Sequence, residues 1–245
     1  MDVVILAGGR CPPDLAEYSG VEHRAMLPFR GKPMVEIVFE ATRHVGSAIV
    51  VGGPATLGER HVEAGENFIE SLAAGLAEVL SDRFLLVTAD LPFLTSEAVD
   101  DFIARCSPGT MLTYPIVDAD VAAEKYPGMK RTVVALREGA FTGGNLAVID
   151  SALMRRSLPI MRRAYAYRKS PLKLAAMVGF GTLARLALAR VFPKSLRISS
   201  LERAVSRFLD GPVVAIPTRY PEIGADIDNL EQYRALAAFD ANELR

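Results

Sequence analysis

Residues 2–10 read DVVILAGGR, a short apolar run that ends at a pair of glycines. The pattern predicts that Val3 to Leu6 form a strand buried on both faces, because the run is uninterrupted by polar residues. Gly8 and Gly9 remove two Cβ atoms where the chain leaves this strand, so backbone N–H groups there can approach an oxygen-rich group closely. The stretch therefore predicts the first strand of a buried sheet followed by a turn suited to an anion.

Short β-rich runs alternate with helical patterns along the rest of the chain. We expect further strands at residues 48–51, 83–88, 110–117, 131–136, 145–149 and 213–216. We expect helices at residues 33–44, 67–80, 96–105 and 230–239, and mostly helical structure over 151–208. This alternation predicts an α/β fold, a Rossmann-like three-layer α/β/α arrangement in which helices cover both faces of a mostly parallel mixed sheet. We expect one domain over residues 1–245, with a basic helical insertion at about 151–210.

Composition and charge narrow the class of protein. Half of the residues are hydrophobic and 23% are charged, which is typical of a globular chain. No basic segment precedes the first apolar run, and the two cysteines make no disulfide framework, so a reduced, cytoplasmic location is expected. Residues 151–210 hold thirteen Lys and Arg but two acids, which indicates an anionic partner. A phosphorylated ligand or a membrane surface is expected there, and nucleic acid is not.

The loop after the glycine pair carries several cations. Arg10, Arg24 and Lys32 are candidates to neutralise a triphosphate. The loop is no Walker A motif, because Gly31-Lys32 is followed by Pro33, and the GxGxxG spacing of dinucleotide-binding proteins is absent. The alternative interpretation is a tight turn surrounded by solvated surface charges.

Carboxylates follow two of the later strands. Asp90 comes directly after the strand 83–88, and ligands of open α/β sheets bind at the carboxyl ends of the strands. Asp226 and Asp228 are two residues apart, so on an extended segment both side chains point the same way. Hard cations choose oxygen ligands, so the three acids predict a metal site. Asp228 has an alternative role as the cap of the helix near Leu230.

Several of these stretches resemble one family of enzymes. VILAGG (residues 4–9), with Arg24 seven residues before the glycine of GKPM (31–34), is similar to MobA-like nucleotidyltransferases, which include molybdenum-cofactor and phospholactate guanylyltransferases. ADLPFL (89–94) resembles that family's metal motif. The family commonly has Lys where this chain has Arg24, which keeps the charge but changes the donor geometry. The resemblance implies a glycosyltransferase-A-type fold.

The resemblance also implies the site residues. The nucleotide is expected at Leu6, Ala7, Gly8, Gly9, Arg10, Arg24, Lys32, Asn67 and Ser71. Mg²⁺ is expected on Asp90, Asp226 and Asp228, and the acceptor at Gly143, Gly144 and Asn145. Simple helix capping is the alternative for Asn67 and Ser71, and a hairpin-type turn is the alternative for the acceptor residues.

The expected activity is transfer of a nucleoside monophosphate from a nucleoside triphosphate to a phosphorylated small-molecule acceptor, with release of pyrophosphate. Arg24, Lys32 and Asp90 are the expected catalytic residues, GTP is favoured, and CTP stays open. Two alternatives remain: a glycosyltransferase that uses a nucleotide sugar, and a non-catalytic regulatory protein that binds nucleotide or membrane.

The stretch from Leu172 to Phe192 is apolar and long enough as a helix to cross a membrane. Arg185 inside it costs about 2.5–3.5 kcal/mol on insertion, and the chain must return to the same sheet, so spanning is not favoured. A lid, a homodimer contact and a peripheral membrane contact are its candidate roles.

Overall fold

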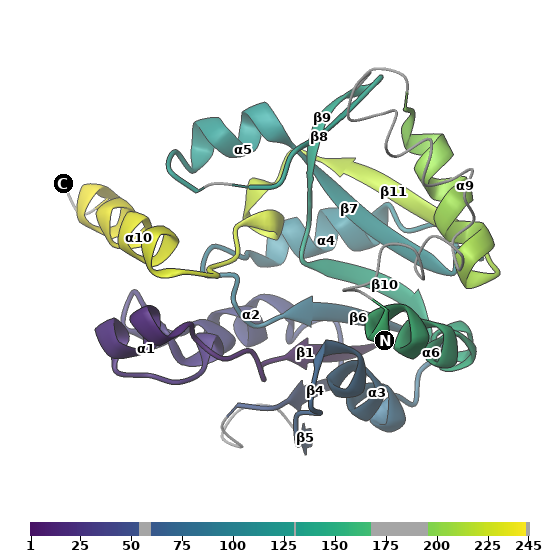
Figure 1. Ribbon diagram of the computed structural model, residues 1–245, viewed down its shortest axis with the longest axis horizontal. Coiled ribbons are helices and arrows are strands. Elements are labelled where there is room, and N and C mark those ends of the chain that lie inside the picture. The colour runs from purple at the N-terminus through teal and green to yellow at the C-terminus, as the bar shows by residue number, and fades with distance from the viewer. Residues whose placement is uncertain (54–59, 130, 168–195, 244–245) are drawn as a thin grey trace.

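The computed structural model describes residues 1–53, 60–129, 131–167 and 196–243, and its centre is a nine-stranded mixed sheet (Figure 1). In spatial order the strands are β5 (Arg60–Val62), β4 (Ala48–Val51), β1 (Asp2–Leu6), β6 (Arg83–Thr88), β10 (Leu146–Asp150), β7 (Leu112–Asp118), β9 (Gly139–Gly143) and β8 (Val134–Leu136). The ninth strand, β11 (Val213–Thr218), pairs with β7. A separate two-stranded hairpin consists of β2 (Pro28–Phe29) and β3 (Lys32–Pro33).

The direction of the strands decides where a ligand can bind. β1 runs parallel to both β4 and β6, so the carboxyl ends of these three strands lie at one edge of the sheet. β10 is antiparallel to β6 and to β7, and β11 is parallel to β7. The predicted α/β class with a mixed sheet is therefore confirmed. The sequence pattern did not reveal that β10 reverses direction between β6 and β7.

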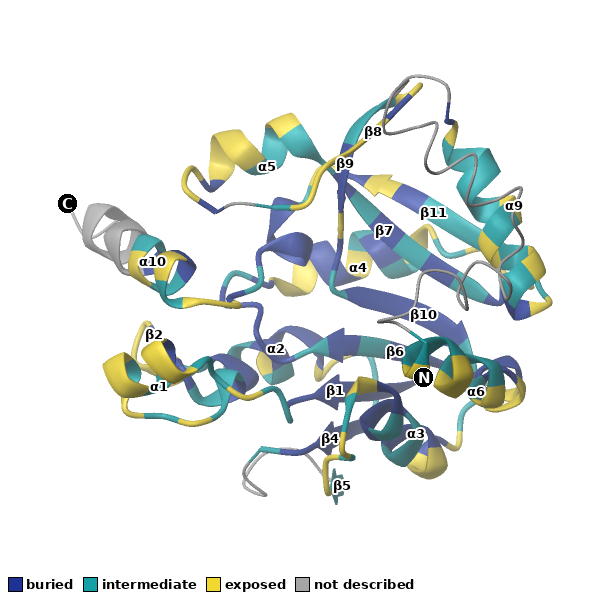
Figure 2. Cartoon of the chain, in the orientation of Figure 1, coloured by how far each residue is buried: buried dark blue, intermediate teal, exposed yellow. Residues whose placement is uncertain are grey.

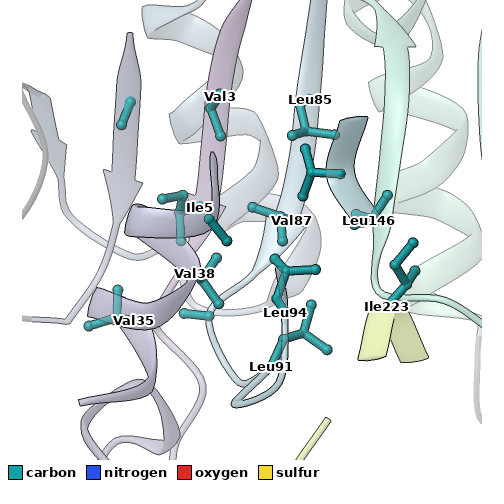
Figure 3. Packing of buried hydrophobic residues seen from close by; sticks show 14 of the residues in the cluster. Val3, Ile5, Val35, Val38, Leu85, Val87, Leu91, Leu94, Leu146 and Ile223 are labelled. Atoms are coloured by element: carbon teal, nitrogen blue, oxygen red, sulfur yellow. The ribbon is translucent and has the colours of Figure 1, made fainter. Parts of the chain in front are cut away.

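Alternate residues of β1 face the two helical layers. Val3 and Ile5 pack with Val35 and Val38 of α2 (Met34–Thr42), as Figure 3 shows, and α4 (Ser96–Ala104) completes that layer. On the opposite face α3 (Phe68–Glu78) and α6 (Ser151–Ala166) cover the strands. Each fully buried Val or Ile contributes about 1.5–3 kcal/mol, and Figure 2 shows β1 and β4 buried along their whole length. This two-sided core holds the strand ends rigidly.

Several short elements surround the carboxyl edge of the sheet. The long loop expected after the glycine pair contains α1 (Pro13–Ser19) and a 3₁₀ turn, η1 (Arg24–Met26). Leu15 of α1 is buried with Leu27 and Phe29, which anchors the loop to the body of the protein. The further helical elements are α5 (Ala119–Lys125), α9 (Ile198–Leu209), η3 (Pro221–Gly224) and α10 (Leu230–Glu243). α1 and α10 pack together at the end of the molecule beyond this edge (Figure 1).

The basic region 151–210 is described at both of its ends. α6 lies on α3, where Arg162 makes a two-pronged ion pair with Glu70, and α9 packs on β11. The stretch 172–192, with its candidate lid, dimer and membrane roles, lies outside the described residues. No helix among the described residues is both long enough and apolar enough to cross a membrane. The single-domain arrangement stays a prediction.

Candidate active site

A cleft of about 780 Å³ opens at the carboxyl ends of β1, β4 and β6. Its walls come from the turn after β1, the turn after β4, the loop before α3 and the end of β6. Eight of the nine residues predicted to bind the nucleotide line it: Leu6, Ala7, Gly8, Gly9, Arg10, Arg24, Asn67 and Ser71. The structure therefore gathers segments that are far apart in the sequence around one space.

The glycines at the mouth of this cleft are required by close packing. A Cβ atom on Gly8 would lie 2.7 Å from Cβ of Ala64, and one on Gly52 would lie 2.7 Å from Cα of Gly8. Gly52 also has a φ of +77°, a conformation that residues with a side chain rarely adopt. A Cβ atom on Gly9 would lie 2.8 Å from Nη2 of Arg24. Glycine at these positions thus allows both the tight turn and the approach of the arginine.

Arg24 joins the cleft to a cluster of carboxylates. Its backbone N–H donates to the carbonyl oxygen of Gly9 at 2.9 Å, which fixes η1 against the glycine turn. Its guanidinium donates through Nη1 to Asp228 and lies with Nη2 3.4 Å from Oδ2 of Asp90. The side chain is 24% exposed, so this cation remains accessible from the cleft.

Asn67 and Ser71 shape the loop that borders the cleft. Oδ1 of Asn67 accepts hydrogen bonds from the backbone N–H groups of Ile69 and Glu70, so it caps α3. Oγ of Ser71 accepts from the backbone N–H of Gly65 at 3.1 Å. The capping role considered for Asn67 is therefore present in the structure, although both residues also line the cleft.

The structure places the predicted cations Arg10 and Lys32 in different parts of the surface, and of these two only Arg10 is among the described residues that line the cleft. Arg10 lines the cleft but is strongly exposed, with Nη1 3.6 Å from Oε2 of Glu22. Lys32 is not among the described residues that line the cleft. It belongs to the β2–β3 hairpin, which carries it to a separate groove beside Phe93, and its Nζ donates to Oε1 of Glu40 at 2.6 Å. The structure thus does not bring Lys32 together with the other predicted residues.

Asp90, Asp226 and Asp228, which we call the acid cluster, converge beside the cleft, which Asp90 lines. Each offers a carboxylate oxygen within 4.8 Å of the others. The backbone N–H of Ile227 donates to the carbonyl oxygen of Asp90 at 3.1 Å, so the segment before α10 is tied to the end of β6. Asn229, not Asp228, caps α10, because its Oδ1 accepts from the backbone N–H of Gln232. The acid cluster is therefore not needed to start that helix.

The chemistry of the acid cluster fits a divalent cation. Oδ1 of Asp90 is buried and has no hydrogen-bond partner among the described atoms, and the same holds for Oγ1 of Thr88 and Nε of Arg24. Burial raises the pKa of Asp90 above its ordinary value, although the neighbouring Arg24 opposes the shift. A hard cation with oxygen preference would satisfy the orphaned carboxylate oxygen and remove the cost of its burial.

Arg131 is a cation at this site that the sequence did not reveal. Its Nη1 donates to the carboxylate of Asp226, and its Nη2 donates to the backbone oxygen of the same residue at 3.0 Å. Burial lowers the pKa of Arg131, while Asp228 and Asp90 oppose the shift. No spacing or motif marks this arginine, because it lies in the segment between α5 and β8 and meets the acid cluster only through the fold.

His23 and Phe68 also line the cleft without having been predicted. The Phe68 side chain begins α3 and is 49% exposed, which is unusual for a large aromatic residue. Nδ1 of His23 is buried and has no partner among the described atoms. In the sequence, the signal for Phe68 is an aromatic residue directly after the asparagine that begins a helical pattern.

The predicted acceptor residues lie on the other side of β6. The backbone N–H of Asn145 donates to Ile223 of η3, and its carbonyl oxygen accepts from the backbone N–H of Thr88 at 3.1 Å. The carbonyl oxygen of Gly144 accepts a hydrogen bond from the hydroxyl of Tyr114 at 2.6 Å. The turn from Gly143 to Asn145 therefore connects the end of β6 with η3, and it is not among the described residues that line the cleft.

The family follows from comparison with known sequences. A profile of the MobA-like NTP transferase domain matches residues 3–188. The chain belongs to this family. No curated protein matches the sequence. The family assignment confirms the resemblance noted in the sequence and supports a transferase that moves nucleotidyl groups.

Solved structures agree with the MobA-like assignment. A hypothetical transferase from Thermus thermophilus is 38% identical, with a TM-score of 0.83 over 95% of this chain and 98% of that one. A nucleotidyl transferase from Methanothermobacter thermautotrophicus is 17% identical, with a TM-score of 0.57 over 100% and 97% of the two chains. The 2-C-methyl-D-erythritol 4-phosphate cytidylyltransferase of Thermus thermophilus is 18% identical, with a TM-score of 0.56 over 98% of each chain. The last two similarities show a shared fold.

Proposed function

We propose that this protein transfers a nucleoside monophosphate from a nucleoside triphosphate to a phosphorylated small-molecule acceptor and releases pyrophosphate. One observation carries the proposal: a cleft walled by glycines reaches Asp90, whose carboxylate converges with those of Asp226 and Asp228, and Arg24 contacts two of the three acids. The glycine turn leaves room for a triphosphate, and we expect its α-phosphate to lie near these carboxylates. Membership of the MobA-like family supports the same reaction class.

The reaction needs positioning and charge neutralisation more than a side-chain nucleophile. An oxygen of the acceptor phosphate attacks the α-phosphorus, the bond from that phosphorus to the bridging oxygen breaks, and the electron pair leaves with pyrophosphate. Arg24 lines the cleft and can neutralise charge on the triphosphate, and the glycine turn offers backbone N–H groups to its oxygens. Lys32 has no part in this proposal, because it lies in a separate groove.

Asp90, Asp226 and Asp228 would hold Mg²⁺, since their oxygens lie close enough to share one ion. When bound, the ion supplies a Lewis acid and a template for phosphate oxygens. The burial of Asp90 keeps its carboxylate in place at the end of β6, and the bond from Ile227 holds the other two acids beside it.

The base is expected at the rim formed by the loop before α3. Phe68 offers an exposed ring for stacking, and the carboxylates of Glu63 and Glu66 line the same part of the cleft. A carboxylate has two acceptor oxygens, which match the two adjacent N–H donors of guanine and meet the one amino group of cytosine less fully. GTP is therefore the first candidate. CTP is the second, because a cytidylyltransferase is among the proteins of similar fold.

Thermal shift with the four nucleoside triphosphates in the presence of Mg²⁺ tests the nucleotide site. A ligand that binds only the folded state raises its stability, by about 2.7 kcal/mol at a hundredfold excess over Kd. We expect GTP or CTP to raise the melting temperature most, and pyrophosphate to appear when phosphorylated acceptors are added. No shift with any of the four would contradict the proposal.

Asp90→Asn tests the role of the acid cluster. We expect pyrophosphate release to fall to background while the melting temperature of the free protein is kept, because the neutral amide is cheaper to bury. Asp82→Asn is the matched control, since Asp82 precedes the same strand at its amino end. Full activity in Asp90→Asn would refute the proposed role of this carboxylate.

A further inference from the structure

Arg131 contacts the acid cluster from a side that the nucleotide cleft does not include. Arg24 contacts Asp90 and Asp228 and lines the cleft, whereas Arg131 contacts Asp226 and lines a separate cavity of about 100 Å³. The acid cluster therefore stands between two arginines, and these two cations border different spaces. A reaction with two anionic substrates needs such a division.

We propose that Arg131 binds the phosphate of the acceptor. Until a divalent cation binds, the guanidinium of Arg131 pairs with the carboxylate of Asp226, which would otherwise be a ligand of that cation. The proposal rests on the nucleotidyl transfer proposed above for the choice of acceptor. Its metal-dependent part rests on the contacts of Arg131 alone, and can therefore be tested without turnover.

The charges of the site support this exchange. Three carboxylates and two guanidinium groups leave one net negative charge on these five side chains, so the site as it stands does not attract phosphate. A divalent cation on the carboxylates changes that balance to one net positive charge. Arg131 then competes with the cation for Asp226, and a phosphate becomes the better partner for its guanidinium.

The burial of Arg131 makes a new partner necessary. Its side chain is 15% exposed, and a buried guanidinium is costly unless it is paired. When the carboxylate of Asp226 turns to a metal ion, Arg131 loses its main acceptor. The planar fork of arginine matches two phosphate oxygens, so an acceptor phosphate replaces the lost carboxylate with the same geometry.

The cavity beside Arg131 indicates which chemical group the acceptor carries next to its phosphate. Its lining is mostly apolar and includes three alanines of α5, together with Met129 and Val133. The hydroxyl-bearing Thr142 also borders it. A volume of about 100 Å³ equals the share of roughly three water molecules, or of a small alkyl group. We therefore infer an acceptor that carries a small apolar group close to its phosphate.

Mn²⁺ binding without any substrate tests the exchange, with free Mn²⁺ followed by electron paramagnetic resonance. We expect Arg131→Met to bind Mn²⁺ about tenfold more tightly than the unmodified protein, because a competing charged partner is removed. Arg131→Lys keeps the charge but loses the fork, so an intermediate affinity is expected. Arg137→Met is the control, since Arg137 is an exposed arginine in the turn of the β8–β9 hairpin, which follows the segment that holds Arg131. Unchanged or weaker Mn²⁺ binding in Arg131→Met would overturn the exchange.

Inorganic phosphate then tests the subsite. Linkage requires that if Mn²⁺ tightens phosphate binding, phosphate tightens Mn²⁺ binding by the same factor. We expect this coupling in the unmodified protein and in Arg24→Met, and its loss in Arg131→Met. Coupling lost in Arg24→Met and kept in Arg131→Met would place the phosphate on the nucleotide side and overturn the proposal.

The two proposals fail in different ways. If no nucleoside triphosphate stabilises the protein but the coupling depends on Arg131, nucleotidyl transfer is wrong and the phosphate subsite stands. A nucleoside triphosphate can instead stabilise the protein while the coupling between Mn²⁺ and phosphate binding is absent, or is the same in Arg131→Met. In that case the phosphate subsite is wrong and the proposed activity stands.

Discussion

Nη2 of Arg24 lies 3.4 Å from Oδ2 of Asp90, so a cation of the loop after β1 touches the carboxylate that follows β6. The same guanidinium donates through Nη1 to Asp228, which comes from the segment before α10. One side chain thus connects three parts of the chain that form the walls of the site. Its removal has consequences for both binding and stability.

Substitution of Arg24 separates charge from geometry. We expect Arg24→Met to lower kcat/KM for the nucleoside triphosphate by about 10–100-fold, since hydrogen bonds to charged groups contribute about 1.5–3 kcal/mol. Arg24→Lys is expected to lie between this variant and the unmodified protein, because lysine keeps the charge and loses the fork. Steady-state pyrophosphate release measures both. Equal activity of all three proteins would show that Arg24 does not contact the substrate.

The exposed ring of Phe68 predicts a stacking partner for the base. We expect Phe68→Ala to raise KM for the nucleoside triphosphate about 5–100-fold, because base–aromatic stacking contributes about 1–3 kcal/mol. Stability should change little, since the ring is 49% exposed. Leu80→Ala is the control, because Leu80 is 86% exposed and is not among the residues that line the cleft. A KM for Phe68→Ala equal to that of the control would contradict the stacking role.

Substitution of Lys32 tests a cation that lies outside the cleft. It pairs with Glu40 on the surface, and exposed ion pairs contribute about 0–1 kcal/mol. We therefore expect Lys32→Ala to leave KM and kcat within about twofold and the free energy of unfolding nearly unchanged. Kinetics and chemical denaturation check the two parts. A tenfold loss of kcat/KM would mean that the β2–β3 hairpin approaches the triphosphate during the reaction.

The lowered pKa of Asp2 predicts that the free energy of unfolding depends on pH. Burial raises its pKa, but hydrogen bonds from Ser81 and Leu80 and the charge of Arg60 outweigh that effect and hold the pKa below its ordinary value. The stabilisation is therefore present above the unfolded-state pKa of about 3.9 and is lost as pH falls through the lower folded-state pKa. We expect Asp2→Asn to cost about 1–2 kcal/mol at pH 7 and much less near pH 3. Denaturation at both pH values measures it, and an equal cost at both would contradict the charge effect.

The sequence predicted the parts of this protein that depend on local patterns. The apolar runs of β1, β4 and β6 and the helices between them follow from periodicity, and the glycine turn marks the position of the cleft. α1 was missed because its helical pattern is only two turns long and includes two prolines at its start, Pro12 at the N-cap and Pro13 as the first helical residue. The direction of β10 was missed because an apolar run is compatible with either direction.

Local patterns also could not place side chains that meet only in three dimensions. Asp90 and Asp226 were expected to converge, because each carried its own signal beside a strand or a helix. Arg131 carried no such signal, and its contact with Asp226 depends on the path of the segment between α5 and β8. Lys32 had a signal from its motif, but the short β2–β3 pairing directs it to another surface.

The hydrogen bond from Ile227 to Asp90 makes the site dependent on almost the whole length of the chain. While the protein is being synthesised, a nascent chain whose first parallel strands have left the ribosome carries the glycine turn and one of the three carboxylates. The other two arrive only with the segment before α10. Synthesis that stops between β6 and that segment therefore gives a chain with one of the three acids.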